Sequence, residues 1–98
     1  MKENVIKSNL KSTLDNFPNK EKEKKGLSRN KLAVESKIRP ATISQIYNDE
    51  AKAVQFDTLV SILNALNRLS LEEGDGRRYT IEDIFTYEAI EKDAPASN

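Results

Sequence analysis

Apolar residues recur at spacings of three and four along much of the chain, which is the pattern of amphipathic helices. The first such stretch comprises Val5, Ile6, Leu10, Leu14 and Phe17. Pro18 should end it. The most apolar stretch, Phe56–Leu66, has Asp57 favourably placed near its N-terminus. No strand-like alternation or tight hairpin signal stands out, so the pattern predicts an all-α fold.

Two short helices are predicted in the middle of the chain. Ser28 is a good N-cap for a helix that ends near Ser36. Pro40 suits the first position of a second helix, which runs to about Tyr47, because its missing N–H costs nothing there. Only Lys37–Arg39 separate the two helices, so they must cross at a steep angle.

This crossing leaves one face of the second helix outside. Ala33 is the small residue that allows the two backbones to approach. The residues that hold the pair from inside are apolar: Leu32, Ile38, Ile43 and Ile46. The residues left outside are small or polar: Arg39, Ala41, Ser44, Gln45 and Asn48. A helix that presents short polar groups outward fits the major groove of DNA.

The stretch Leu27–Ala33 (LSRNKLA), followed by Ile38–Asn48 (IRPATISQIYN), resembles the XRE family, the phage-repressor and Cro type of helix-turn-helix. The resemblance places Ile6–Leu14 as the first helix, Phe56–Leu66 as the fourth and Thr80–Phe85 as the fifth. It implies a compact bundle of about five helices with a lambda-repressor-like DNA-binding fold. It also implies a transcriptional regulator, expected to be a repressor, that binds double-stranded operator DNA. We expect the DNA-binding domain to span residues 1–87 and a polar tail to span residues 88–98.

The chain departs from the family pattern in three places. Lys37 stands where the tight turn usually has glycine, so either the turn differs or the chain accepts a cost of about 1 kcal/mol. A charged insertion, Phe17–Lys25, follows the first helix, and a long link, Asn67–Tyr79, precedes the last one. Thr80 and Asp83 form a capping-box pattern at the start of that last helix.

The exposed face of the second helix supplies the candidate base contacts. Gln45 can pair with adenine through two hydrogen bonds, and Ser44 can serve several bases. Ala41 is a candidate contact for a thymine methyl group. Arg39 could reach a guanine or a phosphate, with phosphate favoured, and Pro40 is mainly structural.

Phosphate contacts are expected at the ends of the two helices. Arg29 opens the first of them, where free N–H groups bind anions, and the resemblance assigns it a backbone contact. Asn48 and Lys52 follow the second helix, and Asn48 is also expected to end it in a left-handed conformation. Lys20–Lys25 could add an electrostatic contact, but Glu21 and Glu23 favour a solvated segment.

The net charge is zero, yet the charges are unevenly distributed. Residues 1–50 hold 11 Lys and Arg against 7 Asp and Glu, and residues 51–98 hold 5 against 9. The segment Lys20–Arg39 carries 8 positive and 3 negative residues. A DNA-binding face needs local positive potential only, so the zero net charge does not exclude nucleic acid.

Composition argues against an enzyme. The chain has no cysteine and no histidine, which excludes disulfides, thiolate metal sites and nucleophile–histidine pairs. There is no glycine-rich phosphate loop and no grouped set of carboxylates. We therefore expect no catalytic residues, no metal and no cofactor. No apolar run is long enough to span a membrane and no secretory signal is present, so the expected location is the cytoplasm.

One alternative stays open. The same scaffold could serve as a protein-interaction module or as an antitoxin-like partner of another protein. A homodimer is expected for a DNA reader of this size, since a single module buries little surface. The sequence does not show the dimer surface, and the apolar candidates outside the main core are Tyr79, Phe85, Tyr87 and Ile90.

Overall fold

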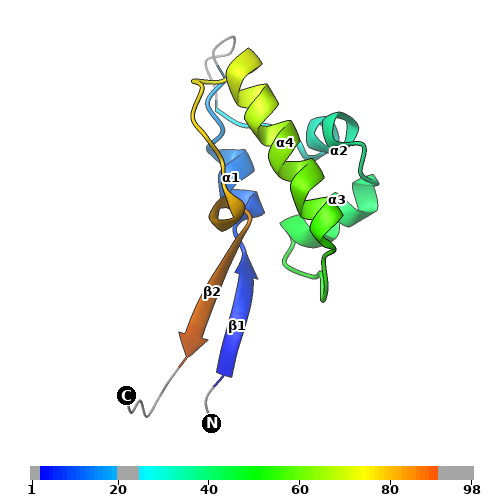
Figure 1. Ribbon diagram of the computed structural model, residues 1–98, viewed down its shortest axis with the longest axis vertical. Helices are drawn as coiled ribbons and strands as arrows, with labels where there is room; N and C mark the ends of the chain where they lie inside the picture. Colours follow the sequence, from blue (N-terminus) through cyan, green and yellow to red (C-terminus); the bar gives the residue numbers. More distant parts are fainter. Residues whose placement is uncertain (1–2, 20–24, 91–98) are drawn as a thin grey trace.

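The computed structural model describes residues 3–19 and 25–90 of the chain. In this part the elements are β1 (Glu3–Ser8), α1 (Leu10–Asp15), α2 (Arg29–Ser36), α3 (Pro40–Tyr47), α4 (Phe56–Glu73), the 3-10 helix η1 (Ile81–Asp83) and β2 (Phe85–Ile90). The helices gather into one body, and the two strands form a ribbon that projects from it (Figure 1).

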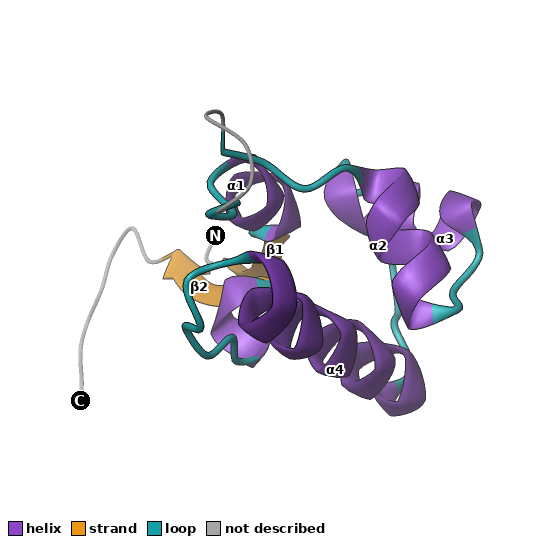
Figure 2. Cartoon of the chain, turned by 90° about the horizontal axis from the view of Figure 1, so that it is seen from above, coloured by secondary structure: helices purple, strands orange, loops and turns teal. Residues whose placement is uncertain are grey.

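The core lies between the four α-helices and the segments that join them. α4 is the long helix that runs past α2 and α3 (Figure 2). Its apolar stripe is buried at Leu59, Ile62, Ala65, Leu66 and Leu69. The other elements and their connections contribute Leu10, Leu14, Phe17, Leu27, Leu32, Ala33, Ile43, Ile46, Tyr79 and Ile84. The predicted helical core is therefore confirmed in its main residues.

The expectation of an all-α fold with five helices is wrong at both ends of the described chain. Val5 and Ile6 belong to β1, so the first helix begins only at Leu10. The expected fifth helix is limited to η1, and β2 follows it directly. β1 and β2 pair antiparallel, from Glu3 opposite Ile90 to Ser8 opposite Phe85. The two strands lie far apart in the sequence, so no hairpin turn joins them and no local turn signal predicts the sheet.

The start of η1 follows the expected local chemistry. The backbone N–H of Thr80 donates to the Asp83 carboxylate at 2.9 Å, and the Thr80 side chain accepts from the Asp83 backbone. The predicted capping box is confirmed, although the helix that it opens is a single short turn.

The prediction of a link over Asn67–Tyr79 is wrong in its first half, which is helical. α4 continues to Glu73 because Leu69 and Ser70 are buried and extend the inward-facing stripe. Tyr79 belongs to the core and not to a free apolar surface, since its ring stacks on Phe17 with centroids 5.8 Å apart.

The polar tail expected at residues 88–98 begins inside the sheet, because β2 runs to Ile90. Residues 91–98 and the charged residues 20–24 lie outside the described part of the chain. Among the described helices, none combines the length and apolar character needed to cross a membrane.

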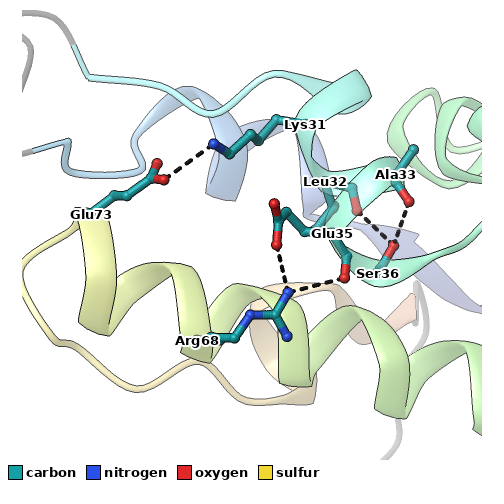
Figure 3. A network of polar contacts seen from close by, with 7 residues as sticks. All are labelled: Lys31, Leu32, Ala33, Glu35, Ser36, Arg68 and Glu73. Atoms are coloured by element: carbon teal, nitrogen blue, oxygen red, sulfur yellow. Dashed lines mark hydrogen bonds and ion pairs between the residues drawn. The ribbon is translucent and has the colours of Figure 1, made fainter.

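Two ion pairs join α2 to α4 (Figure 3). Lys31 Nζ lies 3.1 Å from Glu73 Oε2, and Arg68 Nη2 lies 2.7 Å from Glu35 Oε1. Arg68 also donates to the Glu35 backbone carbonyl at 3.1 Å, near the C-terminal end of α2. These side chains are partly exposed, so each pair contributes modestly to stability.

Candidate nucleic-acid interface

The turn between α2 and α3 has the tight left-handed form despite its lysine. Ser28 Oγ accepts the Lys31 N–H at 3.0 Å at the start of α2, as predicted. Lys37 ends that helix with φ 60° and ψ 36°. Its N–H and that of Ile38 donate to the carbonyls of Val34 and Ala33. Lys37 thus takes a backbone conformation that favours glycine, so the chain accepts the cost.

α3 is held from one side only. Arg39 is extended, with ψ 137°, and Pro40 occupies the first turn of the helix. Ile43 and Ile46 are fully buried. Ala33 is 3% exposed and lies in α2, which packs against α3. The small residue predicted at the crossing is therefore buried in the helix that contacts α3.

The opposite side of α3 faces solvent. Arg39, Pro40, Ala41, Gln45 and Asn48 are exposed, and Ser44 is half-buried. A side chain can reach a base edge only if the fold leaves it accessible. This face therefore offers two hydrogen-bonding side chains, Ser44 and Gln45, flanked by a small apolar residue and an arginine.

The start of α2 meets the end of α3 at an aromatic ring. The Arg29 guanidinium lies over the Tyr47 ring, 4.5 Å from its centroid, which is cation–π geometry. The Tyr47 hydroxyl lies 3.5 Å from Asp15 Oδ1 in α1. Lys11 also bonds Asp15, at 3.2 Å, and this hydrogen bond raises the pKa of the Lys11 ammonium group. Tyr47 is thus a platform that orients Arg29.

A hollow of about 500 Å³ opens beside this ring. Its lining comes from α1, α2, α3 and the segment before α2: Asp15, Leu27, Ser28, Arg29, Asn30, Pro40, Ser44 and Tyr47. Three predicted site residues, Arg29, Pro40 and Ser44, therefore border one open depression. It combines the free N–H groups at the start of α2 with an oriented guanidinium.

Comparison with family descriptions gives a match over this region. Residues 20–68 match the family described as the Cro/C1-type HTH DNA-binding domain. The chain belongs to this family. The match spans α2, α3 and most of α4, which are the helices whose geometry is given above. Comparison with curated proteins and with solved structures gave no match.

In this Cro/C1-type domain the residues after α3 depart from expectation. Asn48 has φ −90°, so the prediction that it is left-handed is wrong. The left-handed residue is the next one, Asp49, with φ 61°. The turn that ends α3 therefore has its left-handed residue directly after the C-cap, where the Glu50 N–H donates to the Gln45 carbonyl at 2.7 Å. Asp49 Oδ1 also accepts the backbone N–H of Ser8 at 3.0 Å.

Lys52 is exposed but lies apart from the α2–α3 depression. It borders a second hollow, of about 520 Å³, together with Ile6, Asp49, Val54 and Phe85 among others. The structure therefore groups Arg29, Pro40 and Ser44 at one depression and places Lys52 on another.

Sequence reasoning missed the role of Tyr47 beside Arg29. Arg29 and Tyr47 are 18 positions apart on different helices, so no periodic signal relates them. Within the described residues, no group of acidic, cysteine or histidine side chains is arranged to hold a metal ion.

Proposed function

We propose that this Cro/C1-type domain binds double-stranded DNA sequence-specifically through α3 and regulates transcription as a repressor. The observation that carries the proposal is the polar outer face of α3, which stays accessible while Ile43 and Ile46 fix the helix from inside. A helix seated in the major groove by this face would exclude other proteins from the same DNA segment.

The side chains divide into two roles. Gln45, Ser44 and Ala41 are proposed to contact base edges, because they are short and lie on the outer face of α3. Arg29, Arg39, Asn48 and Lys52 are proposed to contact phosphates. Arg29 has the clearest support, since the Tyr47 ring holds its guanidinium at the start of α2. Pro40 is proposed to border the DNA while it starts α3.

The experiment is selection of bound fragments from randomised duplexes, followed by affinity measurements on two variants. Gln45→Ala should relax the preference at one base position and cost about 1–3 kcal/mol of discrimination. Lys52→Ala is the matched control, because loss of a phosphate contact weakens binding to all sequences alike. It should also reduce the slope of affinity against salt by about one ion.

Two outcomes would count against the proposal. If Gln45→Ala changes neither the affinity for DNA nor the base preference, α3 is not the helix that contacts the bases. Absence of any affinity for random duplex DNA at low salt would favour the protein-interaction module instead, since a DNA reader also binds non-specifically there.

A further inference from the structure

The Tyr47 ring joins the predicted phosphate contact of α2 to the helix that is proposed to contact bases. Tyr47 is the last residue of α3, two positions after Gln45, and the Arg29 guanidinium lies 4.5 Å from the centroid of its ring. Arg29 opens α2, so the cation and the ring belong to different helices. The contact therefore ties a positive charge on α2 directly to α3.

Two further contacts hold the ring itself. Tyr47 is partly buried and packs against the hydrophobic core. Its hydroxyl lies 3.5 Å from Asp15 Oδ1 in α1, and the Lys11 ammonium group, which pairs with the same carboxylate, lies 5.7 Å from the ring centroid. A ring anchored at both ends has few other positions to take. The guanidinium that rests on it is therefore held in place before any ligand arrives.

The cation–π contact leaves the donors of Arg29 available to a ligand. Such a contact uses the positive charge of the guanidinium and none of its N–H groups. In residues 3–19 and 25–90 no ion pair joins Arg29 to a carboxylate, and its side chain is exposed. Arg29 also borders the hollow beside α3. Its N–H groups can therefore donate to a phosphate oxygen without giving up the contact with Tyr47.

A phosphate contact that is fixed relative to α3 affects which bases this helix can reach. Phosphate contacts carry no sequence information, but they set the position and orientation of the protein on the duplex. When Arg29 is held against Tyr47, the phosphate that it binds lies at one place relative to Gln45. A loose arginine would bind the same phosphate with α3 in many positions. The ring thus makes a sequence-independent contact favour a single register of α3 on the bases.

We propose that Tyr47 is a specificity-determining positioning residue, which acts through Arg29 and does not itself contact DNA. The proposal rests on the proposed function, since it concerns how α3 is placed on the bases. Loss of the ring should lower the affinity for the selected sequence and leave the affinity for random duplex DNA unchanged, because a mobile arginine keeps its charge. The ratio of the two affinities is therefore the quantity to measure.

The experiment compares the full chain with Tyr47→Leu and Tyr47→Phe on the selected duplex and on random duplexes. Tyr47→Leu should reduce the affinity for the selected duplex about two- to fivefold, the strength of an exposed cation–π contact. Its affinity for random duplexes and its slope of affinity against salt should equal those of the wild type. Tyr47→Phe keeps the ring and should bind like the wild type. Tyr87→Leu, at an exposed tyrosine of the ribbon, is the matched control.

A double-mutant cycle separates positioning from a general effect on packing. Arg29→Ala should weaken binding to all duplexes and lower the salt slope by about one ion, because a positive charge is lost. When Arg29→Ala is already present, adding Tyr47→Leu should cost no further affinity for the selected duplex. A merely structural role of Tyr47 would instead give the same loss with and without Arg29→Ala.

Nuclear magnetic resonance of the chain without DNA gives an independent measurement of the contact. The side-chain protons of Arg29 nearest the ring should be shifted upfield in the wild type and in Tyr47→Phe, and should return to ordinary values in Tyr47→Leu. Absence of this shift in the wild type, additive losses in the cycle, or a Tyr47→Phe variant as weak as Tyr47→Leu would each overturn the proposal. A wild-type chain that shows the shift but binds no duplex would instead reject the proposed function, and with it the role of Tyr47.

Discussion

Lys37 carries the tight turn of the helix-turn-helix in a conformation that suits glycine. Its φ of 60° is unfavourable for a residue with a β-carbon, and its side chain is exposed. The hydrogen bond from the Ile38 N–H to the Ala33 carbonyl therefore holds the turn against the conformational preference of Lys37.

Lys37→Gly should stabilise the domain by up to about 1 kcal/mol, because glycine takes this conformation without steric cost. Urea denaturation followed by circular dichroism measures the change. Lys37→Ala is the matched control, since alanine removes the charge but keeps the β-carbon. Equal gains from both substitutions would attribute the effect to charge and not to backbone conformation.

The residue-scale predictions that hold are largely those with a local cause. Ser28, Pro40 and the Thr80–Asp83 pair act on their own backbone within three residues, and each does what its residue type predicts. The prediction for Asn48 is wrong by one position, because the turn that ends α3 has its left-handed residue directly after the C-cap, at Asp49. The contact of Arg29 with Tyr47 joins two helices and lies beyond any local pattern.

At the scale of elements, the spacing of apolar residues predicts the helices from α2 to α4. It does not predict the ribbon of β1 and β2. Val5 and Ile6 continue a helical spacing with Leu10, so this spacing predicts helix where β1 lies. β2 does leave a signal. Phe85 and Tyr87 alternate with Thr86 and Glu88, which is the period of a half-buried strand. Its partner lies so far away in sequence that no hairpin pattern accompanies it.

The end of α4 is a close approach between two segments. Gly74 follows the helix and its backbone donates to the carbonyls of Leu69 and Ser70. A β-carbon on Gly74 would lie 3.0 Å from the Pro18 carbonyl oxygen and 3.2 Å from Ser70 Cα. The loop after α1 and the end of α4 meet here with no room for a side chain.

Gly74→Ala should therefore destabilise the domain by about 1–3 kcal/mol, since backbone atoms must shift to admit a methyl group. The free energy of unfolding in urea gives the answer. Leu71→Ala, at a side chain that is 72% exposed on the same helix, is the control and should change little. Wild-type stability for Gly74→Ala would mean that the Pro18 segment can move aside freely.

At the scale of the whole molecule, one aromatic stack closes the core over α1. Tyr79 lies against Phe17 at 5.8 Å, and its backbone N–H and carbonyl both bond the Asn67 side chain in α4. Burial raises the pKa of the Tyr79 hydroxyl above its ordinary value. The folded chain therefore holds the Tyr79 proton more strongly than the unfolded chain does.

This difference in proton affinity makes the stability of the domain depend on pH. The stability due to this proton is fully present below about pH 10, the pKa of an unfolded tyrosine, and is lost as the pH rises through the folded value. Tyr79→Phe keeps the ring and removes the hydroxyl, so the variant should lose less stability than the wild type in alkaline solution. Urea titrations at neutral and alkaline pH test this, with Tyr87→Phe on the exposed ribbon as control. Identical alkaline losses for wild type and Tyr79→Phe would contradict it.

The pairing of Glu3 with Ile90 has a consequence for biosynthesis. β1 leaves the ribosome before the four α-helices and β2 leaves it after them, so the sheet can close only once β2 has been translated. The helices between them can pack earlier, because their contacts span shorter loops and cost less closure entropy. A chain cut short before β2 by a nonsense codon would thus retain the helices from α1 to α4 and lack the closed ribbon.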